Sequence, residues 1–134
     1  MNYKGQGEIV ELKFFLKSFE NGLIVSKPFG DNQKYDFIVD AENRLSRVQV
    51  KSTFQKDKYS QRNTNRYRIN SSFGASRKKQ YTKKEIDILV VYIQPEDAWY
   101  IIPVDNVCKI KTLSFYPHLK SGKMESFRER WDLF

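Results

Sequence analysis

Asp36, Gln49 and Lys51 are the residues whose types and spacing most clearly suggest chemistry. Asp36 lies in the stretch 35–40, and Gln49 and Lys51 alternate with two valines in the stretch 47–51. Such alternation is typical of a β-strand, so Gln49 and Lys51 are expected on one face and the valines on the other. A carboxylate, an amide oxygen and an ammonium would then meet on one patch. Such a set can hold a divalent metal ion against a phosphate and activate water beside it.

Two adjacent strands, predicted over 35–40 and 44–53, would position these side chains. Lys51 would be an inward-facing charge, able to orient or deprotonate a water or to neutralise charge building on phosphorus. Gln49 supplies a neutral oxygen, and the backbone carbonyl of Val50 is a further candidate ligand. Magnesium suits such a sparse set of protein oxygens, because water and a substrate phosphate complete its coordination.

A helix is predicted over 6–20 and would bring a further carboxylate to the site. Its apolar face is expected to hold four residues at helical spacing, namely Ile9, Leu12, Leu16 and Phe19. Glu8 and Glu11 are three residues apart and therefore lie on one side of the helix. Glu11 sits deeper in the apolar pattern, so we expect Glu11 to reach the metal and Glu8 to be its exposed neighbour.

The apolar pattern in the rest of the chain predicts further strands and a C-terminal helix. The strands are expected over 23–27, 66–71, 86–93 and 99–102, and the stretch 86–93 is the most apolar and the expected centre of the sheet. Residues 123–134 place Met124, Phe127, Trp131 and Phe134 at helical spacing. For 134 residues we expect a single domain over 1–134 of the α/β or α+β class, built on a mixed sheet.

Positive charge is concentrated in one part of the chain. Residues 51–84 hold eleven Lys and Arg residues and one acid, Asp57, whereas the whole chain has a net charge of +8. A basic block on a near-neutral body suits a polyanionic partner, although a solvated surface is the alternative. Amides, hydroxyls and aromatic rings are interleaved with the arginines in this block, as in surfaces that contact nucleic acid.

The composition of the chain limits the cellular compartments and the cofactors that are expected for the protein. No apolar run approaches the roughly 20 residues that cross a bilayer, and the N-terminal residues lack the apolar stretch of a signal peptide. Cys108 and His118 are single, so a disulfide or a Cys/His zinc site within one chain is excluded, and neither residue is assigned a role. We expect a bacterial cytoplasmic or organellar stromal protein with no membrane or small-molecule cofactor.

The order of the polar residues resembles the PD-(D/E)XK nuclease superfamily, with Glu11 on the first helix, Asp36 on a strand and Gln49-Val50-Lys51 on the next. Gln49 stands where that family usually has Asp or Glu. The resemblance is closer to the subset found as group I intron-encoded homing endonucleases, which carry Gln at this position. It covers about residues 4–105 and includes the runs 28–36, 85–87 and 99–104.

The resemblance implies a restriction-endonuclease-like core, with a central mixed sheet flanked by helices. It implies site-specific, magnesium-dependent hydrolysis of both strands of a long double-stranded DNA target, with Mn²⁺ as a substitute and with 5′-phosphate and 3′-hydroxyl ends. In that scheme Asp36 binds the metal, Glu11 assists in the metal shell, Lys51 positions the water and Gln49 replaces an acidic ligand.

DNA reading is expected in the basic segment 55–79. The candidate contacts with phosphate or guanine are Arg62, Arg66, Arg68, Arg77, Lys78 and Lys79. Cutting both strands calls for two active sites, so self-association as a dimer or as a dimer of dimers is expected. The candidate surfaces for it are the C-terminal stretch (Phe127, Trp131, Leu133, Phe134) and residues 115–117, and core packing is the alternative for both.

Two other functions fit the same sequence. A structure-selective nuclease, such as a Holliday junction resolvase, would share the nuclease core. A non-catalytic DNA-binding module is the third possibility, because Gln49 in place of an acid can accompany loss of activity. Against this module stand Glu11, Asp36 and Lys51, since an inactive site has no reason to keep three converging polar groups.

Overall fold

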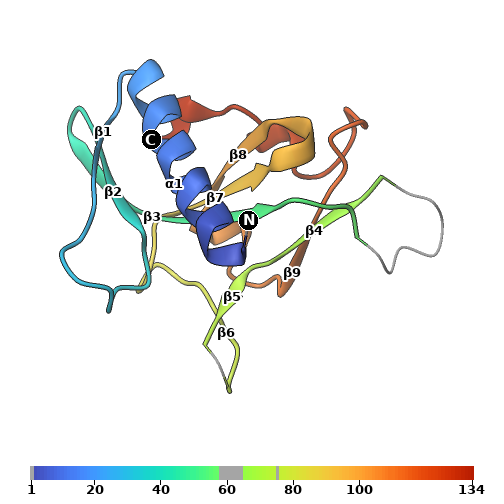
Figure 1. Cartoon of the computed structure of the whole chain (residues 1–134), viewed down its shortest axis with the longest axis horizontal. Coiled ribbons are helices and arrows are strands. Elements are labelled where there is room, and N and C mark those ends of the chain that lie inside the picture. The colour runs from blue at the N-terminus through green and yellow to red at the C-terminus, as the bar shows by residue number, and fades with distance from the viewer. Residues whose placement is uncertain (1, 58–64, 75) are drawn as a thin grey trace.

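A five-stranded sheet covered on one face by a single α-helix forms the centre of the molecule (Figure 1). The computed structural model describes residues 2–57, 65–74 and 76–134. The helix is α1 (Tyr3–Glu20). The sheet has the order β1 (Ile24–Ser26), β2 (Phe37–Ala41), β3 (Arg44–Thr53), β7 (Ile88–Ile93) and β8 (Ala98–Pro103).

The central sheet is mixed, because β3 and β7 run parallel and its other neighbouring strands run antiparallel. Smaller strands lie outside it. β4 (Tyr67–Asn70) pairs with β9 (Thr112–Phe115), and β5 (Ser72–Phe73) pairs with β6 (Lys79–Gln80). Short 3₁₀ turns cover Gln94–Glu96, Val104–Asn106, Glu125–Phe127 and Trp131–Leu133.

Two apolar clusters lie on the two faces of the sheet. Alternate residues of β7 enter each of them, so every residue of this strand is buried. Val10 and Phe14 of α1 pack on Val48 and Val90 in one cluster. The other cluster, on the opposite face, includes Tyr67, Tyr81, Tyr100 and Phe115. The predicted interior position of the strand near 86–93 is therefore confirmed, with β3 and β8 as its neighbours.

The predicted boundaries of the strands that carry the site agree well with the structure. β3 spans Arg44–Thr53, as predicted, and its partner β2 begins at Phe37, one residue after Asp36. The helix begins earlier than predicted because the Asn2 side chain caps it, accepting a hydrogen bond from the Gly5 N–H at 2.9 Å. It ends at Glu20, with Asn21 as its C-cap, and the next residue, Gly22, adopts a left-handed conformation with φ +73°.

The predicted apolar face of α1 is wrong. The residues that face the sheet and are buried are Val10, Phe14 and Ser18. The four residues of the predicted face are exposed, with Leu12 at 69%, Leu16 at 61% and Phe19 at 62%. The helix carries apolar residues on two opposite sides. The sequence prediction, which used helical spacing alone, therefore chose the side with more apolar residues, and that side faces away from the sheet.

The predicted C-terminal helix is also wrong, and so is the flanking of the sheet by more than one helix: α1 is the one α-helix among the described residues. The segment 123–134 runs along the edge strand β8, where the Glu129 N–H donates to the Trp99 carbonyl at 2.8 Å. Phe127 packs on one apolar cluster and Trp131 belongs to the other. Because its side chains serve opposite faces of the sheet, the segment forms two 3₁₀ turns instead. None of the helices described has the length and apolarity to cross a membrane.

Candidate active site

The polar centre lies just before the first residue of β2, where the paired strand β3 continues past it. The Asp36 N–H donates to the Val48 carbonyl at 2.8 Å, as the next rung of the strand ladder would. At the following position the Asp36 carboxylate accepts the Val50 N–H at 2.9 Å. A side-chain oxygen has thus replaced the backbone acceptor, which ends the pairing and holds the Asp36 carboxylate against β3.

Four of the residues predicted as metal ligands line one cavity beside α1. Its volume is about 410 Å³, and its walls include Glu11, Asp36, Gln49 and Val50. Glu8 also lines it and is exposed, whereas Glu11 is partly buried, as expected for these two carboxylates. The structure therefore brings together the candidate ligands that the sequence spreads over 40 residues.

Glu11 has a partner that the sequence did not indicate. The Lys27 ammonium lies 3.0 Å from the Glu11 carboxylate, and it also lies 5.5 Å from the centre of the Phe37 ring. Lys27 follows the short edge strand β1, which folds back beside α1. A lysine at this point in the sequence gives no motif signal, so only the three-dimensional arrangement identifies it.

The surroundings of the Asp36 carboxyl group change its pKa. Burial raises its pKa above the ordinary value, and the nearby negative charge of Glu11 raises it further. The hydrogen bond from Val50 and the charges of Lys27 and Lys51 act in the opposite direction but do not cancel this rise. A carboxylate held in this way gains stability from a cation placed next to it.

Lys51 points from β3 toward β5. Its ammonium donates to the Ser72 carbonyl at 3.1 Å and lies 5.6 Å from the centre of the Tyr81 ring. Burial lowers the pKa of Lys51, and the positive charge of Lys78 lowers it further, against the opposing effect of Asp36. A lowered pKa suits a lysine that handles a proton or a water.

The donor set at the cavity fits a hard divalent cation. Within the ranges described, no three His, Cys, Asp or Glu residues form a group that could hold a metal ion by themselves. The cavity is instead lined by Glu11, Asp36, Gln49 and Val50, whose carboxylates, side-chain amide and backbone carbonyl are candidate oxygen donors. Magnesium accepts one or two carboxylates and keeps several waters, so these donors suit it.

The predicted DNA-contacting residues fall into three groups. Arg62 lies outside the described residues. Arg66 and Arg68 both contact Asp57, at 2.5 Å and 3.7 Å. The other three, Arg77, Lys78 and Lys79, are exposed on the hairpin formed by β5 and β6.

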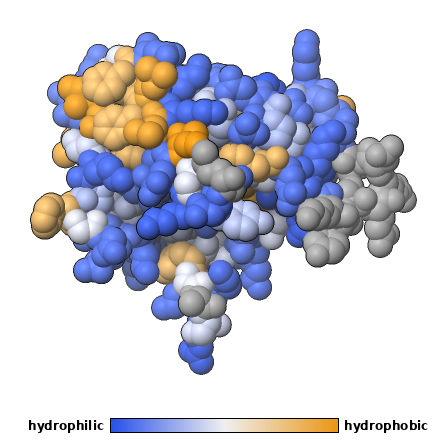
Figure 2. Space-filling view, viewed as in Figure 1, coloured by the Kyte–Doolittle hydropathy of each residue, from blue (hydrophilic) through white to orange (hydrophobic). Residues whose placement is uncertain are grey.

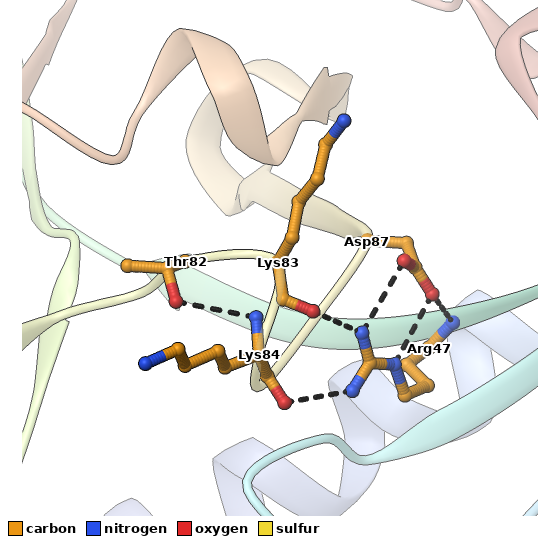
Figure 3. A network of polar contacts seen from close by, with 5 residues as sticks. All are labelled: Arg47, Thr82, Lys83, Lys84 and Asp87. Atoms are coloured by element: carbon orange, nitrogen blue, oxygen red, sulfur yellow. Dashed lines mark hydrogen bonds and ion pairs between the residues drawn. The ribbon is translucent and has the colours of Figure 1, made fainter.

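A separate polar network fixes the parallel pair of strands just before the site (Figure 3). The Arg47 N–H donates to the Asp87 carboxylate at 2.8 Å, and the Arg47 guanidinium reaches the same carboxylate and the carbonyls of Lys83 and Lys84. Burial would raise the pKa of Asp87, but the hydrogen bonds from Arg47 hold it below its ordinary value. The network lies beside Val48 and Ile88, the first pair of the β3–β7 register, and so supports the alignment that positions Gln49 and Lys51.

The mixed five-stranded sheet carries α1 on one face, and β2 begins only after Asp36. This arrangement is that of a restriction-endonuclease-like α+β protein. A family model described as PD-(D/E)XK endonuclease matches residues 1–129, and the chain belongs to this family. Membership makes the protein an endonuclease that hydrolyses phosphodiester bonds in DNA, and nucleases of this family generally use divalent metal ions.

A solved structure is similar over nearly the whole chain. It is that of I-Ssp6803I, a bacterial homing endonuclease, with a TM-score of 0.83, 24% sequence identity and coverage of 99% of this chain and 93% of that one. At this identity the likeness shows the shared fold. Among curated proteins, no match to this chain was found.

Proposed function

We propose that the protein is a site-specific homing endonuclease that cuts both strands of a long double-stranded DNA target with the help of Mg²⁺. The observation that supports this most strongly is the convergence of Glu11, Asp36, Gln49 and Val50 on one cavity. The structural likeness to a bacterial homing endonuclease adds support.

In this proposal Asp36 and Glu11 hold the metal ion, with the Gln49 amide and the Val50 carbonyl as neutral ligands. A bound Mg²⁺ would supply Lewis-acid activation of the scissile phosphate and of the attacking water. Lys51 orients that water or neutralises charge that develops on the phosphate oxygens. The hydrogen bond from Val50 keeps the Asp36 carboxylate turned toward the cavity during the reaction.

DNA would lie across the face that carries the β5–β6 hairpin. Arg77 and Lys78 are exposed there, and the charge of Lys78 acts on Lys51, so the basic hairpin and the proposed catalytic lysine are neighbours. Binding through several phosphate contacts should weaken steeply as salt concentration rises, because each contact releases condensed counterions. A flat salt response would contradict this assignment.

Cutting both strands requires a second copy of the chain, and the exposed side of α1 offers a surface for it. Figure 2 shows an apolar patch at the upper left, over the C-terminal half of α1. Four exposed apolar residues of α1, which we call the α1 stripe, are Ile9, Leu12, Leu16 and Phe19. Their spacing of three, four and three residues is that of the seam of a helix pair.

The charges beside the α1 stripe favour a second copy of the same helix. Lys13 and Glu20 are both exposed and lie on the same side of the stripe. In an antiparallel pair of α1 helices these flanks face each other, so Glu20 of one copy would lie near Lys13 of the other, whose ammonium also donates to the Tyr92 hydroxyl of its own chain at 3.4 Å. The C-terminal candidates are less suitable, because Trp131 and Phe115 are buried in the apolar clusters.

The test of the proposed function compares two DNA substrates. Linear duplexes that contain sites selected from a random library, and a four-way junction of similar length, would be offered with Mg²⁺ and analysed on denaturing gels. A homing endonuclease should cut the selected duplexes on both strands and spare the junction. Preferential cutting of the junction would favour a structure-selective nuclease, and binding without cutting would favour a DNA-binding module.

A further inference from the structure

The Lys51 ammonium is held by a backbone carbonyl from another part of the sheet system. Lys51 lies on β3, whereas its acceptor Ser72 lies on β5, 21 residues later, with the oxygen 3.1 Å from the nitrogen. A lysine side chain is flexible, and its ammonium needs fixed acceptors to keep one position. The position of the Ser72 carbonyl therefore decides where the proposed catalytic ammonium lies.

Asn70 fixes the backbone at Ser72. The Asn70 side-chain oxygen accepts the Ser72 N–H at 3.0 Å and the Ser72 hydroxyl at 2.5 Å. Asn70 is the last residue of β4, where it pairs with Thr112 of β9. Ser72 is only 5% exposed, so its peptide has little room to rotate. This local turn sets the orientation of Ser72 relative to β4.

The ring of Tyr81 is the second group that contacts the Lys51 ammonium. Its side chain is 3% exposed and directly follows β6, and the Lys51 nitrogen lies 5.6 Å from the centre of its ring. The face of an aromatic ring attracts an ammonium at this distance. The Tyr81 ring in turn packs on Phe73 of β5, with the ring centres 5.0 Å apart. Both contacts of the ammonium thus come from the β5–β6 hairpin and its flanks.

We infer that Asn70 and Tyr81 are positioning residues for Lys51, acting through the Ser72 carbonyl and the aromatic ring. The inference rests on the proposed function of Lys51. It goes beyond that function by making the β5–β6 hairpin, which carries Arg77 and Lys78, part of the catalytic arrangement. DNA would then contact the same hairpin whose residues hold the Lys51 ammonium in place.

The first test measures Lys51 itself, in the full chain without DNA or metal. The ¹H–¹³C signal of the Lys51 ε-methylene group can be assigned by its loss in Lys51→Arg. The nearby ring should shift this signal away from those of exposed lysines. Tyr81→Leu should remove the shift, while Tyr81→Phe, which keeps the ring, should preserve it. Asn70→Ala should also move the signal, whereas Asn70→Asp, which keeps an acceptor oxygen, should leave it close to that of the wild type.

The second test measures turnover on supercoiled plasmid with Mg²⁺. Misplacing a catalytic group by about 1 Å can cost on the order of 100-fold in rate, so Asn70→Ala and Tyr81→Leu should lower kcat by about 10- to 100-fold. KM should stay within about two-fold, because neither side chain is assigned to DNA binding. Asn70→Asp and Tyr81→Phe should restore most of kcat. The exposed Asn43→Ala in the turn between β2 and β3 serves as the matched control.

The inference is overturned if the Lys51 signal is unmoved in both Asn70→Ala and Tyr81→Leu. It is also overturned if the conservative variants fail to restore the signal. If Tyr81→Leu does not fold, the signal of Lys51 in Asn70→Ala still tests the inference. Asn70 is exposed, so we expect this variant to fold. Since the signal is read without DNA, a failure of the nuclease proposal would show as absent cleavage with the Lys51 shifts intact.

Discussion

The Lys27 ammonium lies 3.0 Å from the Glu11 carboxylate at the wall of the proposed metal cavity. A cation from the protein therefore occupies a position next to a predicted metal ligand. The pair is partly exposed, and pairs of this kind contribute little stability. If Glu11 is a metal ligand as proposed, a metal ion would have to compete with Lys27 for its carboxylate.

We expect Lys27→Gln to tighten binding of divalent metal by about two- to five-fold, in keeping with the small energy of a partly exposed pair. Calorimetric titration of the protein with Mn²⁺, without DNA, would measure this. The exposed Lys120→Gln, remote in sequence, is the matched control for loss of one positive charge. Weaker binding in Lys27→Gln would show that Lys27 supports the metal site instead of competing with it.

Replacing the amide of Gln49 by a carboxylate should strengthen the metal site. Ligand charge is one of the factors that set affinity for hard cations, so we expect Gln49→Glu to bind Mn²⁺ more tightly by on the order of ten-fold. The same titration measures the change, with exposed Gln94→Glu as the control for added charge. An unchanged titration would count against Gln49 as a ligand.

The raised pKa of Asp36 makes a prediction about stability and pH. Between the ordinary value of 3.8 and the higher folded-state pKa, the folded protein binds more protons at Asp36 than the unfolded chain does. The stability linked to this group is therefore fully present below pH 3.8 and is lost as pH rises through the folded-state pKa. At neutral pH the desolvated charge destabilises the fold.

Asp36→Asn removes this charge while an amide oxygen can still accept the Val50 N–H. We expect the variant to have a higher Tm than the wild type at pH 7, by on the order of a few degrees. The difference should shrink as pH falls toward 3.8, and thermal unfolding followed by circular dichroism across this range would show it. Asp31→Asn, in an exposed loop, is the control. A lower Tm for Asp36→Asn at pH 7 would contradict the assigned effect of burial.

The α1 stripe should control assembly. Leu12→Glu combined with Leu16→Glu places charges at the centre of the proposed helix pair, so we expect the proposed dimer to dissociate into monomers that remain folded. Sedimentation velocity would measure the mass in solution, and circular dichroism would check the fold. Leu45→Glu is a matched control, because Leu45 is 67% exposed but lies on β3. A double variant that assembles like the wild type would exclude the α1 stripe as the contact, and so would a wild type that is already monomeric.

The strands of the site could be predicted from the sequence because each has a clear local signal. β3 alternates apolar and polar residues and sits after a turn, which defines both its limits and its two faces. β7 is a continuous apolar run, as expected for a strand covered on both sides. Gln49 and Lys51 therefore lie on β3 as predicted, whereas Asp36, predicted within the preceding strand, lies one residue before β2.

Helical spacing was a poorer guide, for a physical reason that differs between the two segments. In α1 both sides are apolar, so spacing could not tell which side meets the sheet; Val10 and Phe14 do so, and Leu12 and Leu16 do not. Near the C-terminus, the spacing arises because the segment passes along β8 and fills a cluster on each side.

Contacts between distant segments could not be predicted at all. Lys27 meets Glu11 across 16 residues, and Lys51 meets Ser72 across 21, without any motif that links them. Such pairs depend on how β1 and β5 are placed around the sheet. They are also the contacts that add new partners to the residues predicted for the site.

The most direct test of the central claim is cleavage of supercoiled plasmid in the presence of Mg²⁺ by the wild type, Asp36→Ala and Lys51→Ala. The wild type should convert the plasmid to nicked and linear forms with 5′-phosphate ends. Both variants should lose this activity while remaining folded by circular dichroism. Cleavage that survives in the two variants would contradict the assignment of Asp36 and Lys51 to the active site.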